Sequence, residues 1–153
     1  METTHIYIAT DVEYLAPYKG HGAFAVTMVN GEYTKTIKTA LRNATDYSAI
    51  EMAVVCALGS LRKGGQKIVI HTKNKAYVDG FNNGMKSENS TNYDYYQMIK
   101  IISEKQESIT AEWVNRNDDA WFVKTKAEAV ALKRSAYPYL SFKQPIYIQK
   151  PFA

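Results

Sequence analysis

Two charged residues follow apolar segments of this chain, and their chemistry limits what the chain can do. An Ile-Val-Ile run at residues 68–70 leads through His71 and Thr72 to Lys73, and an earlier alternating segment ends at Asp11. A lysine ammonium cannot ligate Mg²⁺ and repels it, but it can bind a phosphate or pair with a carboxylate. Two interpretations stay open: Asp11 and Lys73 form a structural ion pair, or Asp11 belongs to a functional site.

Histidine and cysteine offer little further chemistry. His5, His21 and His71 are far apart in the sequence and lack the spacing of zinc ligands, so no zinc site is predicted. Cys56 is the only cysteine, which excludes an internal disulfide. Because it falls in an apolar helical segment, we expect it to lie in the core.

Length and composition indicate one globular domain. The chain has 153 residues, 46% of them hydrophobic, which is enough to fill a single core. A net charge of +4 is compatible with a polyanionic partner and also with an ordinary protein surface. No apolar stretch approaches the roughly 18 residues of a membrane span, and residues 1–5 do not resemble a signal peptide. We therefore expect a soluble, cytoplasmic protein without membrane contact.

Hydrophobic periodicity, turn residues and helix caps predict nine elements in the order β-β-β-α-β-α-α-β-α. Asn30-Gly31 predicts a hairpin, and Thr45 or Asp46 is the expected N-cap of an almost wholly apolar helix. This order predicts an α/β fold with a mixed five-stranded sheet and helices on both faces. The strands are expected at residues 5–11, 23–29, 32–40, 67–71 and 109–114, and the helices at 45–61, 74–81, 93–105 and 120–135.

The last segment of the chain differs from the rest. Residues 137–153 contain three prolines and many large apolar side chains, too many to leave in water. We expect a domain over residues 1–135 and an extension over residues 136–153. That extension is expected to pack on the domain or on a partner, which includes a second copy of the chain.

Five short motifs are spread along the chain. They are Thr-Asp-Val-Glu at 10–13, Gly-His-Gly-Ala at 20–23, Asn-Tyr-Asp-Tyr-Tyr at 92–96, Ala-Glu-Trp-Val-Asn-Arg-Asn at 111–117 and Ala-Glu-Ala-Val-Ala at 127–131. In their order and spacing the chain resembles the type 1 ribonuclease H family, within the RNase H-like superfamily, over roughly residues 5–135. The resemblance implies strand order 3-2-1-4-5, with strand 2 antiparallel to the others.

The resemblance also implies an active site, which this sequence matches poorly. The family cuts the RNA strand of RNA–DNA hybrids with two Mg²⁺ ions held about 4 Å apart by four carboxylates. Asp11 matches the first carboxylate, and Glu51 stands one residue from the second, whose place Ile50 takes without a gap. Lys73 replaces the third, and Glu128 matches the fourth with a small gap. At 4 Å, Lys73 would repel Mg²⁺ by roughly 8 kcal/mol at an effective dielectric near 20.

The same alignment marks residues that could touch nucleic acid. Lys73, Asn74 and Lys75 lie at the start of the predicted helix 74–81, and Arg116 and Asn117 lie in the loop before the last helix. Asn117 replaces the loop histidine that aids product release in the family. We expect these five residues to contact nucleic acid if the chain binds it.

Three functions remain open. The first is a catalytically degenerate domain that binds nucleic acid or acts as a scaffold, and it needs no cofactor. The second is a divergent Mg²⁺-dependent ribonuclease H that cuts RNA in RNA–DNA hybrids with Asp11, Glu51 and Glu128. The third is a protein-interaction module without nucleic-acid binding, with residues 136–153 as a dimer or partner contact.

Overall fold

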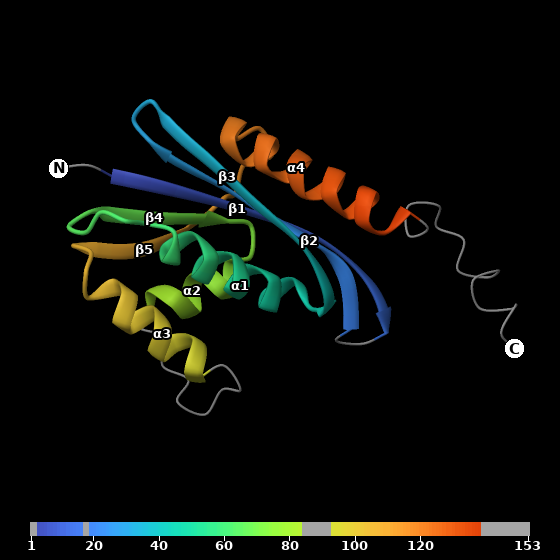
Figure 1. Cartoon of the computed structure of the whole chain (residues 1–153), viewed down its shortest axis with the longest axis horizontal. Coiled ribbons are helices and arrows are strands. Elements are labelled where there is room, and N and C mark those ends of the chain that lie inside the picture. The colour runs from blue at the N-terminus through green and yellow to red at the C-terminus, as the bar shows by residue number, and fades with distance from the viewer. Residues whose placement is uncertain (1–2, 17–18, 84–92, 139–153) are drawn as a thin grey trace, which may run out of the picture.

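The computed structural model describes residues 3–16, 19–83 and 93–138, which form five strands and four helices (Figure 1). The strands are β1 (Thr3–Ala16), β2 (Lys19–Asn30), β3 (Tyr33–Ala44), β4 (Lys67–Thr72) and β5 (Ser108–Trp113). The helices are α1 (Asp46–Gly59), α2 (Lys75–Asn82), α3 (Tyr93–Ser103) and α4 (Ala120–Ala136). All nine predicted elements are present in the predicted order.

One mixed sheet joins the five strands in the order β3-β2-β1-β4-β5. β2 pairs antiparallel with both β1 and β3, whereas β4 pairs parallel with both β1 and β5. Strand β2 therefore runs opposite to the other four, and the predicted topology is confirmed. The last pair between β1 and β4 is Tyr7 with His71.

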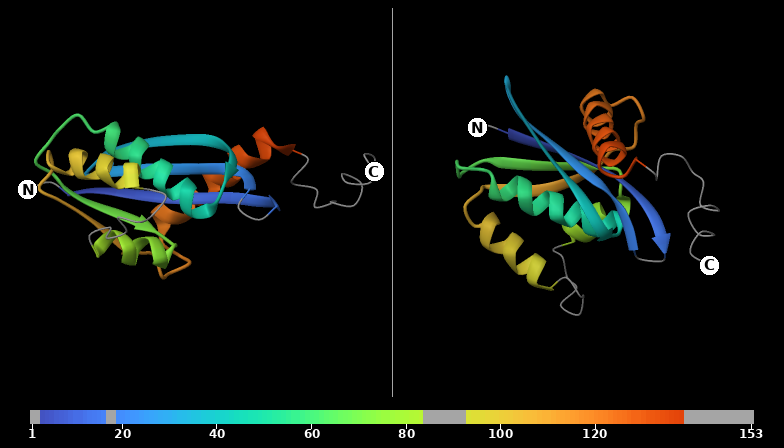
Figure 2. Two further views of the ribbon diagram at one scale, coloured as in Figure 1. Left: turned by 90° about the horizontal axis from the view of Figure 1, so that it is seen from below. Right: turned by 45° about the vertical axis from the view of Figure 1, so that its right-hand side comes forward.

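Helices cover both faces of the sheet (Figures 1 and 2). Helices α1, α2 and α3 lie on one side, and α4 lies across β1, β2 and β3 on the other. Ile6 and Ile8 of β1 are fully buried in the main core together with Ile50 and Val54 of α1. Odd-numbered Ala9 turns to the opposite face, where it joins a smaller cluster with α4.

Helix α1 differs in one respect from its prediction. Thr45 is its N-cap and forms a capping box with Ser48, as the sequence indicated. The helix is not covered all round, because Met52 is 46% exposed and Cys56 is exposed as well. The prediction that Cys56 lies in the core is therefore wrong. Both side chains occupy the stripe of α1 that faces away from the sheet.

The first two strands extend well beyond their predicted ends. Their antiparallel ladder continues past Asp11, which is opposite Ala23, as far as Ala16 opposite Lys19. Gly22 permits this approach, because a Cβ there would lie 2.0 Å from the carbonyl oxygen of Asp11. The long ladder matters for the site, because it carries β1 beyond the end of β4.

Helix α4 ends where the apolar extension begins. The Tyr137 hydroxyl donates to the carbonyl oxygen of Leu41 at 2.8 Å, and its ring stacks on His21 with centroids 5.2 Å apart. Most of the predicted extension, residues 139–153, lies outside the described residues.

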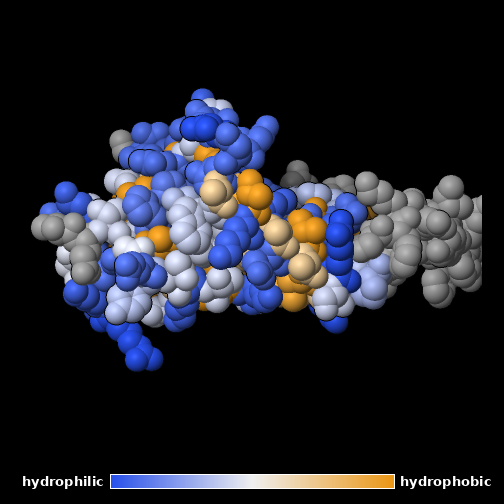
Figure 3. Space-filling model, turned by 90° about the horizontal axis from the view of Figure 1, so that it is seen from above, coloured by the Kyte–Doolittle hydropathy of each residue, from blue (hydrophilic) through white to orange (hydrophobic). Residues whose placement is uncertain are grey.

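Figure 3 shows the molecule from above, relative to the view of Figure 1. This face is mostly hydrophilic, and its hydrophobic residues are gathered in small groups. On α4, Val123 is half exposed. No helix within the described ranges is long and apolar enough to cross a bilayer.

Candidate anion pocket

A pocket of about 620 Å³ lies beside the end of β4, between α1 and α4. Apolar side chains from three elements form part of its wall: Ile8 and Ala9 of β1, Ile50 of α1, and Phe122 and Val123 of α4. Its charged groups are three lysines and a single aspartate: Lys73, Lys75, Lys126 and Asp46. Thr10, Thr72, Asn74 and Asn117 complete the lining. The pocket thus combines an apolar wall with an excess of positive charge.

Lys73 is held in place from two directions. Its ammonium donates a hydrogen bond to Asn117 Oδ1 at 2.6 Å and lies 5.4 Å from the centroid of the Phe122 ring. Its backbone carbonyl accepts a hydrogen bond from Trp113 Nε1 at 3.2 Å. A cation over an aromatic face is favourable. These contacts fix the position of an ammonium that remains exposed to solvent.

The residues that follow Lys73 begin helix α2. Asn74 is the N-cap, and its Oδ1 accepts from the backbone N–H of Tyr77 at 3.0 Å. Lys75 lies 5.3 Å over the ring of Trp113. The helix start therefore presents two lysines, Lys73 and Lys75, to the same pocket.

Lys126 is the third pocket lysine, and the sequence did not single it out. It lies one helical turn after Phe122, and its ammonium donates to the carbonyl oxygen of Thr10 on β1. The Thr10 hydroxyl in turn donates to the carboxylate of Asp46. Asp46, the only acidic residue among the described residues that line the pocket, is thus already engaged in a hydrogen bond.

Asp11 lies elsewhere. It forms an ion pair with Lys133 of α4 at 3.3 Å, with side chains 21% and 13% exposed, and it does not line the pocket. Of the two interpretations that the sequence left open, the ion pair between Asp11 and Lys73 is therefore wrong. Tyr7 of β1 lies opposite His71 of β4. Counted from this pair, Lys73 lies two residues after His71, and Asp11 lies four residues after Tyr7. Asp11 consequently lies about 7 Å past Lys73 along the strand direction, because each strand residue rises about 3.3 Å.

The other two carboxylates that the sequence aligned are also outside the pocket. Glu128 pairs with Lys38 of β3 at 2.9 Å. Ile50 lines the pocket and Glu51 does not, so helix α1 is not shifted by the one residue that would bring Glu51 into the pocket. One residue corresponds to a rotation of about 100° around a helix. Arg116 is exposed and pairs with Asp118 at 3.0 Å, so of the five aligned polar residues only Arg116 is away from the pocket.

Glu51 occupies an unusual position for a carboxylate. It is 6% exposed, and its Oε2 has no hydrogen-bond partner in the described part of the chain. Burial raises the pKa values of Tyr47, Tyr77 and Tyr95, and the nearby charge of Glu51 adds a smaller upward effect on each. Burial raises the pKa of Glu51 itself from 4.5 to about 7. A buried carboxyl without a partner favours its neutral form.

This donor set does not fit two magnesium ions. Mg²⁺ is bound by carboxylates, other oxygen ligands and water, and two-metal sites bring several carboxylates together. The pocket offers one hydrogen-bonded carboxylate and three lysines. Across residues 3–16, 19–83 and 93–138, no three His, Cys, Asp or Glu side chains are placed to hold a metal ion. The pocket instead suits an anion.

Comparison with solved structures assigns the fold. The N-terminal RNase H domain of Rv2228c from Mycobacterium tuberculosis, in a fusion with maltose-binding protein, matches with a TM-score of 0.63 and 15% identity, covering 87% of this chain and 98% of that one. LC11-RNase H1 in complex with an RNA/DNA hybrid matches with a TM-score of 0.65 and 15% identity over 84% and 96% of the two chains. RNase H1 from the archaeon Halobacterium salinarum gives 0.61 and 15% over 83% and 96%.

The chain therefore has the RNase H-like fold, as the sequence motifs predicted. At these identities the likeness concerns the fold alone. No protein-family model matches the sequence, and no curated protein matches it.

Proposed function

We propose that this chain is a catalytically degenerate RNase H-like domain that binds the phosphates of nucleic acid without cutting them. The observation that carries the proposal is Lys73, a fixed ammonium in the pocket between α1 and α4. Lys75 and Lys126 add two more positive charges to the same lining. Lysine is a common phosphate ligand, acting as a point charge.

The surroundings of Lys73 support binding rather than hydrolysis. A divalent cation near this ammonium would be repelled by several kcal/mol, whereas a phosphate would be attracted. Among the described residues that line the pocket, Asp46 is the only carboxylate, and it already accepts a hydrogen bond from the Thr10 hydroxyl. One carboxylate cannot hold the two metal ions of the family's metal-assisted hydrolysis.

The alternative is a divergent nuclease that uses Asp11, Glu51 and Glu128. Two of these carboxylates are neutralised by lysines, Lys133 and Lys38, and the third is buried. Gathering them around one metal ion would require both ion pairs to break. This cost weighs against the nuclease alternative.

A binding titration tests the proposal. Fluorescence anisotropy of a short labelled RNA–DNA hybrid should show weak, largely sequence-independent binding that falls steeply between about 50 and 200 mM salt. Lys73→Ala should weaken binding and reduce the slope of log K against log salt by about 0.7–0.9, which corresponds to one phosphate contact. Lys67→Ala is the matched control, because Lys67 is exposed at the opposite end of the same strand.

Three results would contradict the proposal. Binding that is equally affected by Lys67→Ala and Lys73→Ala would mean that only net charge matters. Cleavage of the hybrid with Mg²⁺ or Mn²⁺ that disappears in Asp11→Asn would establish the nuclease alternative. If Lys73→Ala lowers stability and leaves binding unchanged, its role is structural.

A further inference from the structure

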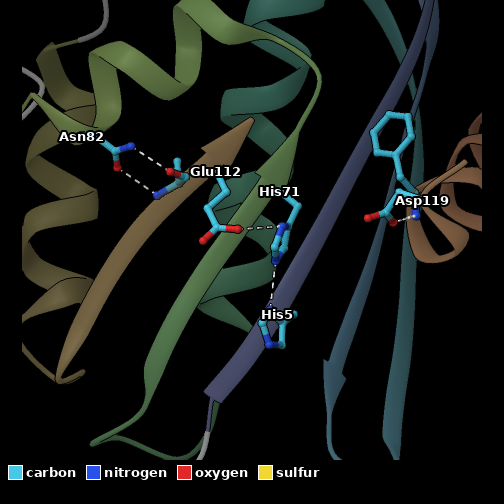
Figure 4. A network of polar contacts seen from close by, with 7 residues as sticks. His5, His71, Asn82, Glu112 and Asp119 are labelled. Atoms are coloured by element: carbon cyan, nitrogen blue, oxygen red, sulfur yellow. Dashed lines mark hydrogen bonds and ion pairs between the residues drawn. The ribbon is translucent and has the colours of Figure 1, made fainter. Parts of the chain in front are cut away.

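Two histidines that are 66 residues apart in sequence meet on the α4 side of the sheet (Figure 4). Nδ1 of His5 on β1 is 2.9 Å from Nε2 of His71 on β4. The parallel register brings them together, because His5 is opposite Val69 and Tyr7 is opposite His71. Sequence spacing alone could not reveal this pair, since it depends on which strands are neighbours.

The neighbours of His71 fix its orientation. The ring of Tyr7 stacks on the His71 ring with centroids 4.4 Å apart and planes 10° from parallel. Glu112 of β5 places its Oε2 3.7 Å from His71 Nδ1, on the side away from His5 (Figure 4). A carboxylate beside Nδ1 favours the tautomer with its proton there. The lone pair of Nε2 then points towards His5.

Burial and the nearby His5 lower the pKa of His71, against the weaker opposite effects of Glu112 and Asp119. His71 is therefore neutral at pH 7, which is the form that ligates metal ions. The side chain of His71 is 12% exposed and that of Glu112 is 64% exposed, so His71 is largely covered and Glu112 lies at the molecular surface.

We propose that His5 Nδ1 and His71 Nε2 form a binding site for one divalent transition-metal ion of the zinc type. Zinc–nitrogen bonds are about 2.0–2.1 Å, so tetrahedral ligands lie roughly 3.4 Å apart. The two nitrogens would have to separate by about 0.5 Å from their hydrogen-bonded distance, so both rings must rotate and their hydrogen bond must break. Water fills the remaining coordination positions, because the described chain groups no third ligand with this pair.

Glu112 has a positioning role in this site. A ligating histidine usually donates its second N–H to a carboxylate, which fixes the ring and strengthens the ligand, and losing that partner typically costs 10–100-fold in metal affinity. Glu112 Oε2 lies 3.7 Å from that second nitrogen of His71, which is longer than a hydrogen bond. Glu112 would therefore have to move a few tenths of an ångström closer to take this role when an ion binds.

Isothermal titration of the full chain with ZnCl₂ at pH 7.5 tests the site. The wild type should bind one Zn²⁺ per chain, His5→Ala and His71→Ala should each bind at least about tenfold more weakly, and Glu112→Gln should show a similar loss. His21→Ala is the matched control and should bind as the wild type does, because His21 stacks on Tyr137 away from the pair. Circular dichroism melts of each variant show whether it is folded.

His5→Gln provides a second test if removal of the buried His71 ring prevents folding. Zinc should also shift the ring resonances of His5 and His71 in NMR spectra and leave those of His21 unchanged. Equal zinc binding by the wild type, His5→Ala and His5→Gln would overturn the proposal, as would no binding at millimolar zinc. This site is independent of the proposed function, because Lys73→Ala should leave zinc binding unchanged.

Discussion

Replacement of the buried carboxyl of Glu51 by an amide should remove a pH dependence from the stability of the domain. Burial raises the pKa of Glu51 from 4.5 to about 7 in the folded state. Below pH 4.5 the carboxyl is neutral in the folded and unfolded chains, so the folded state bears no penalty. Between pH 4.5 and 7 the unfolded chain loses the proton first, and the free energy of unfolding falls as the pH rises. Above about pH 7 the carboxyl is ionised in the folded and the unfolded chain, so the free energy of unfolding falls no further.

The size of the effect follows from the shift. A difference of 2.5 pKa units at 1.36 kcal/mol each gives at most about 3 kcal/mol. Glu51→Gln keeps the shape of the side chain and cannot ionise. The variant should therefore match the wild type at pH 4.5 and be more stable by up to about 3 kcal/mol at pH 8. For a domain of this size that difference corresponds to roughly 10 °C in melting temperature.

Urea unfolding followed by fluorescence at pH 4.5, 6, 7 and 8 measures this difference directly. Comparison of the two proteins at each pH cancels the titration of all other groups. Glu128→Gln is the control for the loss of a carboxylate, because Glu128 is exposed and paired with Lys38, and it should change stability by less than about 1 kcal/mol. A difference between Glu51→Gln and the wild type that is the same at every pH would refute the reasoning.

Four further predictions concern the ion pair of Asp11, the segment after α4 and the pocket. Asp11→Asn should lower the free energy of unfolding by about 1–2 kcal/mol, measured in urea, because it leaves a largely buried lysine of α4 unpaired. Tyr137→Phe should lower the free energy of unfolding by about 1 kcal/mol, because it leaves the Leu41 carbonyl without its donor. Removal of residues 136–153 takes away the same hydrogen bond, so it should lower the melting temperature at least as much as Tyr137→Phe does. Lys73→Asp should gain no metal-dependent hydrolysis of a labelled hybrid, because a single restored carboxylate cannot hold two ions; measurable cutting would contradict this.

Local sequence patterns were sufficient to predict the helices and strands of this fold. Thr45 and Asn74 cap the helices that they were expected to begin, and Gly31, with φ of +59°, turns the hairpin that Asn30-Gly31 predicted. The family motifs then supplied the strand order, which periodicity alone does not determine. Strand ends were less predictable, because the β1–β2 ladder continues for as long as backbone groups can pair. The residues around Asp11 show no pattern that predicts the continuation of the β1–β2 ladder.

The candidate site was only partly predictable for the same reason. Lys73, Asn74 and Lys75 are adjacent in sequence, so a single motif marked them all. Lys126 reaches the pocket only through the docking of α4, and no motif marks that residue. The partner of Asp11 depends on how far β1 passes the end of β4. The contact between His5 and His71 depends on the parallel register of β1 and β4, which no local sequence pattern predicts.

The contact between Lys126 and the carbonyl of Thr10 has a consequence for how the protein is made. The two residues are 116 positions apart, so two walls of the pocket come from segments that are far apart in the sequence. Contacts so distant in sequence form slowly, because a long loop must close before they are gained. During synthesis, a ribosome-bound chain has its sheet strands outside the tunnel before α4 emerges. Such a nascent chain holds a partial fold without an assembled pocket, so anion binding should begin only after α4 has emerged.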